Sequence, residues 1–157
     1  MRSAVTCLLV TLLVSVGAAQ QRSASTEPAP CETALKEQFI QWAAAYKARD
    51  LSGTMSIFAD DVIFSFQGSP DQGRAELEAG YRRSFSHTDS SQEWVPHFEE
   101  FACAGDLGFV RSTWELVAAD KQGASQQLAR NRGVDIFRRG SDGRWRIIRS
   151  LNYPAAR

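Results

Sequence analysis

DLSGTMSIFADDVIFSF, residues 50–66, contains the change from a helical pattern to a strand pattern that determines the architecture of this protein. Asp50 is a helix-capping residue type, and we expect a short helix to follow it through Phe58. Residues 62–66 are rich in β-branched and aromatic side chains, which favours a strand. The carboxylate pair Asp60–Asp61 stands at the junction, where we expect it to cap the turn.

Helical patterns lie on both sides of this stretch. Before it, apolar side chains recur at steps of four, three and four, which predicts a helix from about residue 32 to 48. These side chains are Leu35, Phe39, Trp42 and Tyr46. After it, glycines and a proline at 68–73 end the strand, and residues 74–85 are expected to form a third helix.

From residue 92 onward, the chain alternates between strand patterns and turns. Strands are expected at 93–103, 108–118, 127–138 and 144–152, with turns at 104–106, 120–124 and 140–143. Pro96 predicts an edge strand or a bulge, because proline has no backbone N–H to donate. Consecutive strands joined by short turns form an antiparallel meander. Helices first and strands later therefore predict an α+β domain with helices on one face of a curved sheet.

The N-terminal segment differs from the rest of the chain. Residues 1–19 start with Arg2, continue with an uncharged apolar run and end in Gly-Ala-Ala, which predicts a cleavable signal peptide. The apolar run is about 13 residues, whereas a membrane span needs about 20, so cleavage is favoured over an anchor. Residues 20–30 predict a flexible leader, and residues 31–157 one domain. We expect a secreted or periplasmic protein without membrane contact after cleavage.

The composition excludes several classes of partner. Lys plus Arg is 18 and Asp plus Glu is 18, so no basic excess is present to hold a nucleic acid. The histidines and cysteines lack the spacing of a metal site, and no metal or cofactor is expected. Gly68 and Gly73 are spaced as in a phosphate loop, but Arg74 and Ala75 follow where such a loop needs Lys and Ser or Thr.

Signal cleavage would leave two cysteines, Cys31 and Cys103. In an oxidising compartment they can form one disulfide, and two separate thiols are the alternative. A bond that closes so long a loop would stabilise the fold by roughly 4 kcal/mol in the chain-entropy view.

Several motifs together resemble a known family. The run DLSGTMSIFADDVIFSFQGSPDQGRAELEAGYRRSF, with AGDLGFVRSTWEL and VDIFRRGSDGRWRII further on, is similar to SnoaL-like and ketosteroid-isomerase-like proteins of the nuclear transport factor 2-like superfamily. The resemblance covers about residues 34–154 and is closest to an exported branch. It implies a cone-shaped α+β barrel in which three N-terminal helices pack on a strongly curved, mostly antiparallel sheet around a pocket. Because many members are homodimers, it also implies a homodimer.

The resemblance also indicates which positions carry chemistry. Ketosteroid isomerase uses a base carboxylate at the end of the first strand, a tyrosine on the first helix and a late-strand aspartic acid held neutral by apolar surroundings. Phe66 stands at the base position and Trp42 at the tyrosine position, so no steroid isomerase activity is expected. Asp135 stands at the late-strand position, and Arg149 follows on the next strand.

Asp135 is therefore the main candidate for a catalytic residue. Strand alternation puts it on the same face as Phe137, and an aromatic-lined cone would raise its pKa. It would then suit a general acid or a hydrogen-bond donor to a ligand carbonyl. The alternative is a structural ion pair with Arg111, Arg132 or Arg149.

Other residues are candidates for the same site. Tyr46, one helical turn beyond Trp42, could donate through its hydroxyl, and His97 on a strand could act as an acid or base. The expected pocket wall consists of Trp42, Phe64, Phe66, Trp114 and Arg149.

Three functions remain open. The first is an exported domain that binds a small hydrophobic molecule in an aromatic-lined pocket, with Asp135 as the polar handle. The alternative is a lyase, isomerase or cyclase that acts on a hydrophobic carbonyl compound, with Asp135 as general acid. The second alternative is a dimerisation scaffold whose cone is filled by its own side chains.

Overall fold

The computed structural model describes residues 30–87, 92–119 and 125–155. The elements are α1 (Pro30–Lys47), α2 (Leu51–Met55), β1 (Phe58–Phe66), α3 (Arg74–His87), β2 (Gln92–Ala104), β3 (Leu107–Ala119), β4 (Ser125–Arg139) and β5 (Trp145–Pro154). Each expected helix and strand is present, although Pro30, which we expected in the leader, begins α1. The expected signal peptide, the rest of the leader and the turn at 120–124 lie outside the described residues.

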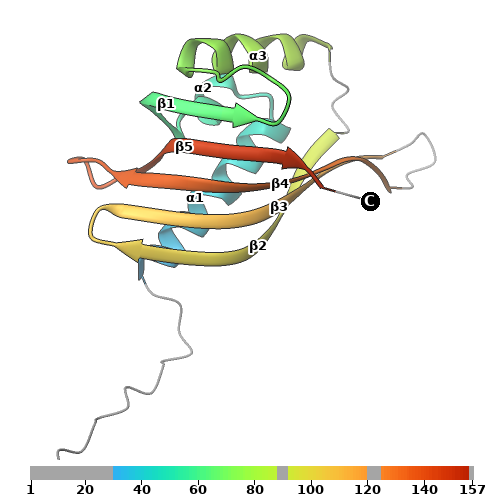
Figure 1. The fold of residues 1–157 in the computed structure, drawn as a ribbon. Helices are drawn as coiled ribbons and strands as arrows, with labels where there is room; N and C mark the ends of the chain where they lie inside the picture. Colours follow the sequence, from blue (N-terminus) through green and yellow to red (C-terminus); the bar gives the residue numbers. More distant parts are fainter. Residues whose placement is uncertain (1–29, 88–91, 120–124, 156–157) are drawn as a thin grey trace, which may run out of the picture.

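The strands form one mixed sheet in the order β1-β5-β4-β3-β2. Neighbours from β2 to β5 are antiparallel, whereas β1 pairs in parallel with β5. The helices lie on one side of the sheet (Figure 1). The predicted α+β class and mostly antiparallel sheet are confirmed. The sheet is not closed into a barrel, because β1 and β2 remain its two edges. Pro96 lies in the edge strand β2, as expected.

Irregular strand pairing bends this sheet. The register shifts between Phe98 and Glu100 in β2, between Leu116 and Val117 in β3, and between Ile136 and Phe137 in β4. An extra residue in one strand of a pair kinks that strand and increases its twist. The bent sheet therefore curves around the helices instead of lying flat against them.

The start of α1 is fastened to the β2–β3 hairpin. Leu35 is fully buried against Gly108, where a Cβ atom would lie 2.8 Å from the Leu35 Cδ1 atom. A larger residue at position 108 would force the buried Leu35 side chain to move. The predicted disulfide joins Cys31 in α1 to Cys103 in β2, with their Cα atoms 6.6 Å apart. Both contacts hold the first two turns of α1 on the sheet.

After Asp50, the helix is shorter and the strand is longer than we expected. The Asp50 side chain accepts a hydrogen bond of 3.0 Å from the Gly53 N–H, so the predicted cap is confirmed. The helix ends at Met55 rather than continuing through Phe58, because Ser56 turns back to hydrogen bond with the Gly53 carbonyl.

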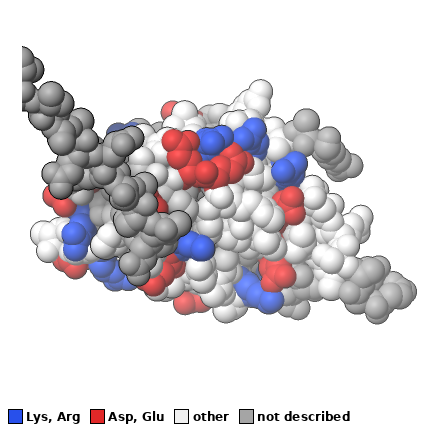
Figure 2. All heavy atoms as spheres, turned by 90° about the horizontal axis from the view of Figure 1, so that it is seen from below, with Lys and Arg blue, Asp and Glu red and all other residues white. Residues whose placement is uncertain are grey.

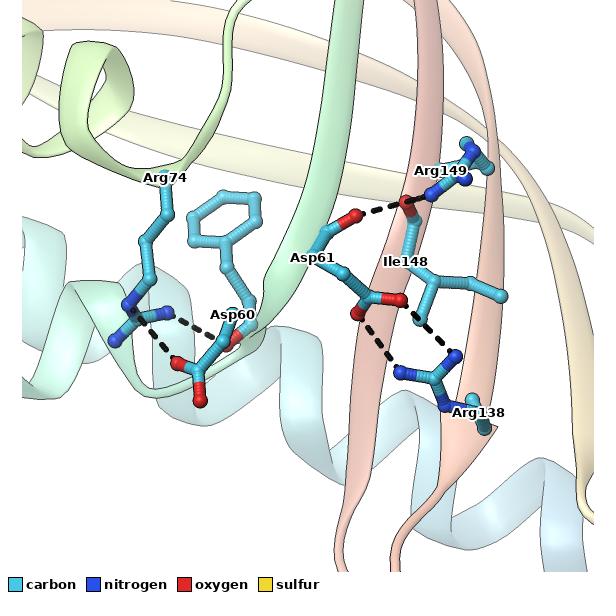
Figure 3. Close-up of polar contacts among 7 residues, drawn as sticks. Asp60, Asp61, Arg74, Arg138, Ile148 and Arg149 are labelled. Atoms are coloured by element: carbon cyan, nitrogen blue, oxygen red, sulfur yellow. Dashed lines mark hydrogen bonds and ion pairs between the residues drawn. The ribbon is translucent and has the colours of Figure 1, made fainter.

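Asp60 and Asp61 lie inside β1 and do not cap a turn, which corrects our expectation. Their carboxylates are exposed and pair with arginines from other elements (Figure 3). Asp60 is 3.5 Å from Arg74, and Asp61 forms two hydrogen bonds with Arg138, of 2.8 and 3.1 Å. The pair therefore serves to connect β1 with α3 and β4.

The described surface has a mixed charge distribution. On the face shown in Figure 2, acidic and basic side chains lie next to one another in small groups, and uncharged surface separates these groups. None of the helices in the described part of the chain is long and apolar enough to cross a membrane.

Candidate functional site

A partly open cavity of about 330 Å³ lies between the helices and the bent sheet. Much of its wall is aromatic, with contributions from Phe39, Trp42, Tyr46, Phe58, Phe64, Tyr81, Trp94 and Trp114. Its polar groups come from Gln72, Ser84, Asn131, Asp135, Ser150 and Asn152. A mainly apolar wall with a few polar groups is the usual composition of a small-molecule site, and the volume is at the lower end of such sites.

The aromatic rings of this wall hold one another in place. Trp42 and Tyr46 lie one turn apart on α1, and their ring centroids are 5.5 Å apart. The Trp42 ring meets Trp114 of β3 edge to face at 5.1 Å, and Tyr81 of α3 edge to face at 6.4 Å. Edge-to-face contacts are favourable because the positive edge of one ring meets the negative face of the next. Packing between α1, α3 and β3 thus holds this part of the wall in place.

Asp135 is the buried carboxyl group of the cavity. Alternation along β4 turns it inward, and only 4% of its surface is exposed. Its cross-strand neighbours are Val110 of β3 and Ser150 of β5. Burial raises the pKa of Asp135 to about 7, because the charged form loses its hydration. A hydrogen bond of 2.5 Å from the Ser150 hydroxyl to Oδ1 opposes this rise without cancelling it.

A hydrogen-bond relay connects Asp135 to the end of β5. The Asn152 Nδ2 atom donates to the Ser150 Oγ atom at 2.7 Å, and the Ser150 hydroxyl donates to Asp135 Oδ1. With Oδ1 accepting from Ser150, a proton on the carboxyl group resides on Oδ2. Gly133 makes room for this relay, because a Cβ atom there would overlap Asn152 Oδ1. The relay therefore positions the carboxyl group and its proton.

The arginines that we considered as partners of Asp135 are engaged elsewhere. Arg111 and Arg132 each lie 2.8 Å from Glu99 Oε2. Arg149 donates to the backbone carbonyls of Asp61 and Ile148, at 3.1 and 2.6 Å (Figure 3). The ion-pair alternative is therefore wrong.

Strand register explains the placement of these arginines. Arg149 pairs with Ile136 and Arg111 with Val134, the two residues that flank Asp135 along β4. Because successive strand residues point to opposite faces, these arginines lie on the outer face of the sheet and Asp135 on the inner face.

The residues that we expected in the pocket wall separate into two groups. Trp42, Phe64, Trp114 and Tyr46 line the cavity. Arg149 does not line the cavity, because its side chain lies on the outer face of the sheet. Phe66 lies two residues after Phe64 along β1 and pairs with Asn152 of β5. It lines a separate shallow hollow together with Asn152 and Tyr153.

His97 also lies away from the cavity. It is on the outer face of β2, with 55% of its side chain exposed, and its Nε2 atom is 3.5 Å from a carboxylate oxygen of Glu115. Its strand neighbours Pro96 and Phe98 face the opposite way. His97 is therefore not placed to act on a molecule in the cavity.

Tyr81 and Asn152 belong to the site but were not among the residues that we expected there. Burial raises the pKa of the Tyr81 phenol above its usual range, and the nearby Asp135 and Tyr46 add to the rise. The Trp42 indole N–H has a weak opposing effect on that pKa, yet Trp42 Nε1 has no well-aligned hydrogen-bond partner within the described residues. The spacing of Ser150 and Asn152, two apart on one strand, was the available signal for the relay.

Within the described residues, no group of three or more histidine, cysteine, aspartate or glutamate side chains could hold a metal ion. Asp135 therefore does not belong to a cluster of this kind.

Solved structures with the same fold include proteins from several bacteria. A conserved protein from Planctomyces limnophilus is 23% identical, with a TM-score of 0.68, and the match covers 80% of this chain and 96% of that one. A ketosteroid isomerase-like protein from Erwinia carotovora is 20% identical, with a TM-score of 0.62 and the same coverage. An NTF2-like protein with a cystatin-like fold from Novosphingobium aromaticivorans is 16% identical, with a TM-score of 0.65, covering 78% of this chain and 80% of that one.

These similarities show that the chain shares the α+β fold of an NTF2-like protein with a cystatin-like fold. The chain belongs to the SnoaL-like domain family, whose family model matches residues 39–148. A search of curated proteins finds no match to this chain. Membership of the family indicates small-molecule binding or an isomerase-like function.

Proposed function

We propose that this protein binds a small, largely hydrophobic molecule in the cavity, with Asp135 as its polar handle. The observation that carries this proposal is a single, almost fully buried carboxyl group in a wall of described residues that is otherwise mainly apolar and rich in aromatic rings. Aromatic side chains supply apolar contact area, and one well-placed polar group orients the ligand. The apolar part of such a molecule gains free energy by leaving water for contact with these rings.

The raised pKa of Asp135 would allow this residue to act as a general acid as well as a binding group. With a pKa of about 7, the carboxyl group still holds its proton in much of the protein near neutral pH. A general acid works best when its pKa lies near the working pH. The second candidate function is therefore a lyase, isomerase or cyclase in which Asp135 Oδ2–H polarises or protonates a carbonyl oxygen. In either function Ser150 and Asn152 orient the carboxyl group.

Steroid isomerisation by the mechanism of ketosteroid isomerase is not part of this proposal. That reaction needs a carboxylate base at the end of the first strand, and Phe66 has no group that accepts a proton. Phe66 also does not line the cavity. The similarity to the ketosteroid isomerase-like protein supports a shared fold, not a shared substrate.

We also propose that the protein is exported and forms a homodimer. The signal-like composition of residues 1–19 supports export, and a disulfide between Cys31 and Cys103 suits an oxidising compartment. Exposed apolar side chains on the outer face of the sheet, including Leu151 and Tyr153, would be covered in a dimer. Size-exclusion chromatography with light scattering tests the dimer, and N-terminal sequencing of the secreted protein tests cleavage.

Native, non-reducing mass spectrometry of the protein purified from its own compartment tests ligand binding. We expect extra mass on the wild-type protein that is absent from Asp135→Asn and present in Asp61→Asn, a matched variant of an exposed carboxylate. The released compound can then be tested for turnover. A bare wild-type mass that stays unchanged after incubation with hydrophobic carbonyl compounds would refute the binding proposal and favour a scaffold.

A further inference from the structure

The charge of the cavity wall limits which ligands it can accept. The titratable groups of the wall are Tyr46, Tyr81 and Asp135, and no Lys, Arg or His is among the described residues that line it. Only burial and the Ser150 hydrogen bond act on the pKa of Asp135, so no cation of the described chain serves as its counter-ion. An anionic ligand would therefore find no positive charge among these residues to compensate its own.

The aromatic rings of the wall also favour a positively charged ligand. The face of an aromatic ring carries partial negative charge, and a cation that lies over it is attracted, most strongly when water is excluded. Rings from α1, α3, β1, β2 and β3 surround the cavity, and they include Trp42, Trp94 and Trp114. Tryptophan has the most favourable ring for this interaction.

From these two features we propose that the ligand is an organic cation, a substituted ammonium group held between aromatic faces with the Asp135 carboxylate as its counter-ion. The inference rests on the proposed binding function and specifies its ligand class. A cation supplies the charge partner that the described chain does not give to its buried carboxyl group. The volume of about 330 Å³ accommodates such a group with a short substituent.

The proposal predicts a dependence on pH that a neutral ligand would not have. The other titratable groups of the cavity wall are the phenols of Tyr46 on α1 and Tyr81 on α3. The strand neighbours of Asp135 are Ser150 on β5, whose hydroxyl donates to it, and the apolar Val110 on β3. Burial keeps the Tyr81 phenol neutral well above neutral pH. The charge of the site therefore changes through Asp135, which becomes an anion as the pH rises through about 7. Cation binding should strengthen in that direction.

Two probes of the same shape separate charge from hydrophobicity. Choline carries a trimethylammonium group, and 3,3-dimethylbutan-1-ol is its neutral carbon analogue. We would measure both affinities by calorimetry and tryptophan fluorescence, with the full chain as purified, at about pH 8 and about pH 5. We expect choline to bind at least tenfold more tightly than the alcohol at the higher pH, which is about one unit in log Kd. That preference should shrink severalfold at the lower pH.

Two variants test whether the preference for choline over the alcohol depends on the Asp135 carboxyl group. Asp135→Asn should lose the preference for choline over the alcohol. Asp61→Asn, which removes an exposed carboxylate outside the cavity, should keep it. The pH dependence of the wild-type protein provides the test if Asp135→Asn does not fold.

Two results would overturn this inference. If the alcohol binds as tightly as choline at both pH values, the ligand is not a cation, although the proposed binding function stands. If neither probe binds, the cation inference is also wrong, and the native mass measurement decides the binding function independently.

Discussion

Replacing Asp135 by asparagine should change how the stability of the protein depends on pH. In the unfolded chain the carboxyl group titrates near its usual pKa of 3.8, whereas in the folded protein its pKa is about 7. Between these values the folded protein binds more protons than the unfolded chain, so the free energy of unfolding falls as the pH rises. The difference between the two pKa values corresponds to a loss of up to about 4 kcal/mol.

The asparagine side chain of Asp135→Asn has nearly the same shape as aspartic acid but no proton to release, so this loss should be absent from the variant. Urea unfolding followed by tryptophan fluorescence, with the disulfide intact, measures the free energy of unfolding from about pH 4 to about pH 8. The wild-type curve should fall relative to the Asp135→Asn curve by a few kcal/mol over that range. Asp61→Asn serves as the control, because the Asp61 carboxylate is exposed and its pKa is lowered by Arg138. Parallel curves for the wild type and Asp135→Asn would refute the reasoning.

Three further substitutions test the supports of the site. Ser150→Ala should raise the pKa of Asp135 further, because it removes the hydrogen bond that stabilises the carboxylate; ¹³C NMR of the labelled carboxyl group measures this, and an unchanged pKa would contradict it. Gly133→Ala should destabilise the fold by about 1–3 kcal/mol, since its methyl group would overlap Asn152; an unchanged urea midpoint would count against this packing. Replacing both bonded cysteines by serine should lower the free energy of unfolding by roughly 4 kcal/mol, measured against the oxidised wild type, and no loss would show that the bond is unimportant for stability.

Much of the fold was predictable because its signals are local. Helical spacing identified α1, β-branched and aromatic residues identified β1, and turn residues separated the later strands. The end of α2, which was expected near Phe58, lies where Arg74 donates hydrogen bonds to the Met55 and Phe58 carbonyls. Those contacts come from α3, and no local pattern could reveal them.

The candidate site was predictable only for residues whose direction follows from periodicity. Alternation along β4 places Asp135 on the inner face with Phe137, and spacing on α1 places Trp42 and Tyr46 on one side. The contribution of Tyr81 depends on how α3 packs against the sheet. That packing is not encoded within α3 itself.

The sequence by itself determined the class of the fold, the order of its elements and that Asp135 shares a strand face with Phe137, since these follow from periods of 3.6 and 2 residues. Tertiary structure alone decided that β1 pairs in parallel with β5, that Arg149 lies on the outer face and that Phe66 lies outside the cavity. Strand partners and sheet curvature arise from contacts between distant segments. Whether a residue meets a ligand depends on those contacts and not on its neighbours along the chain.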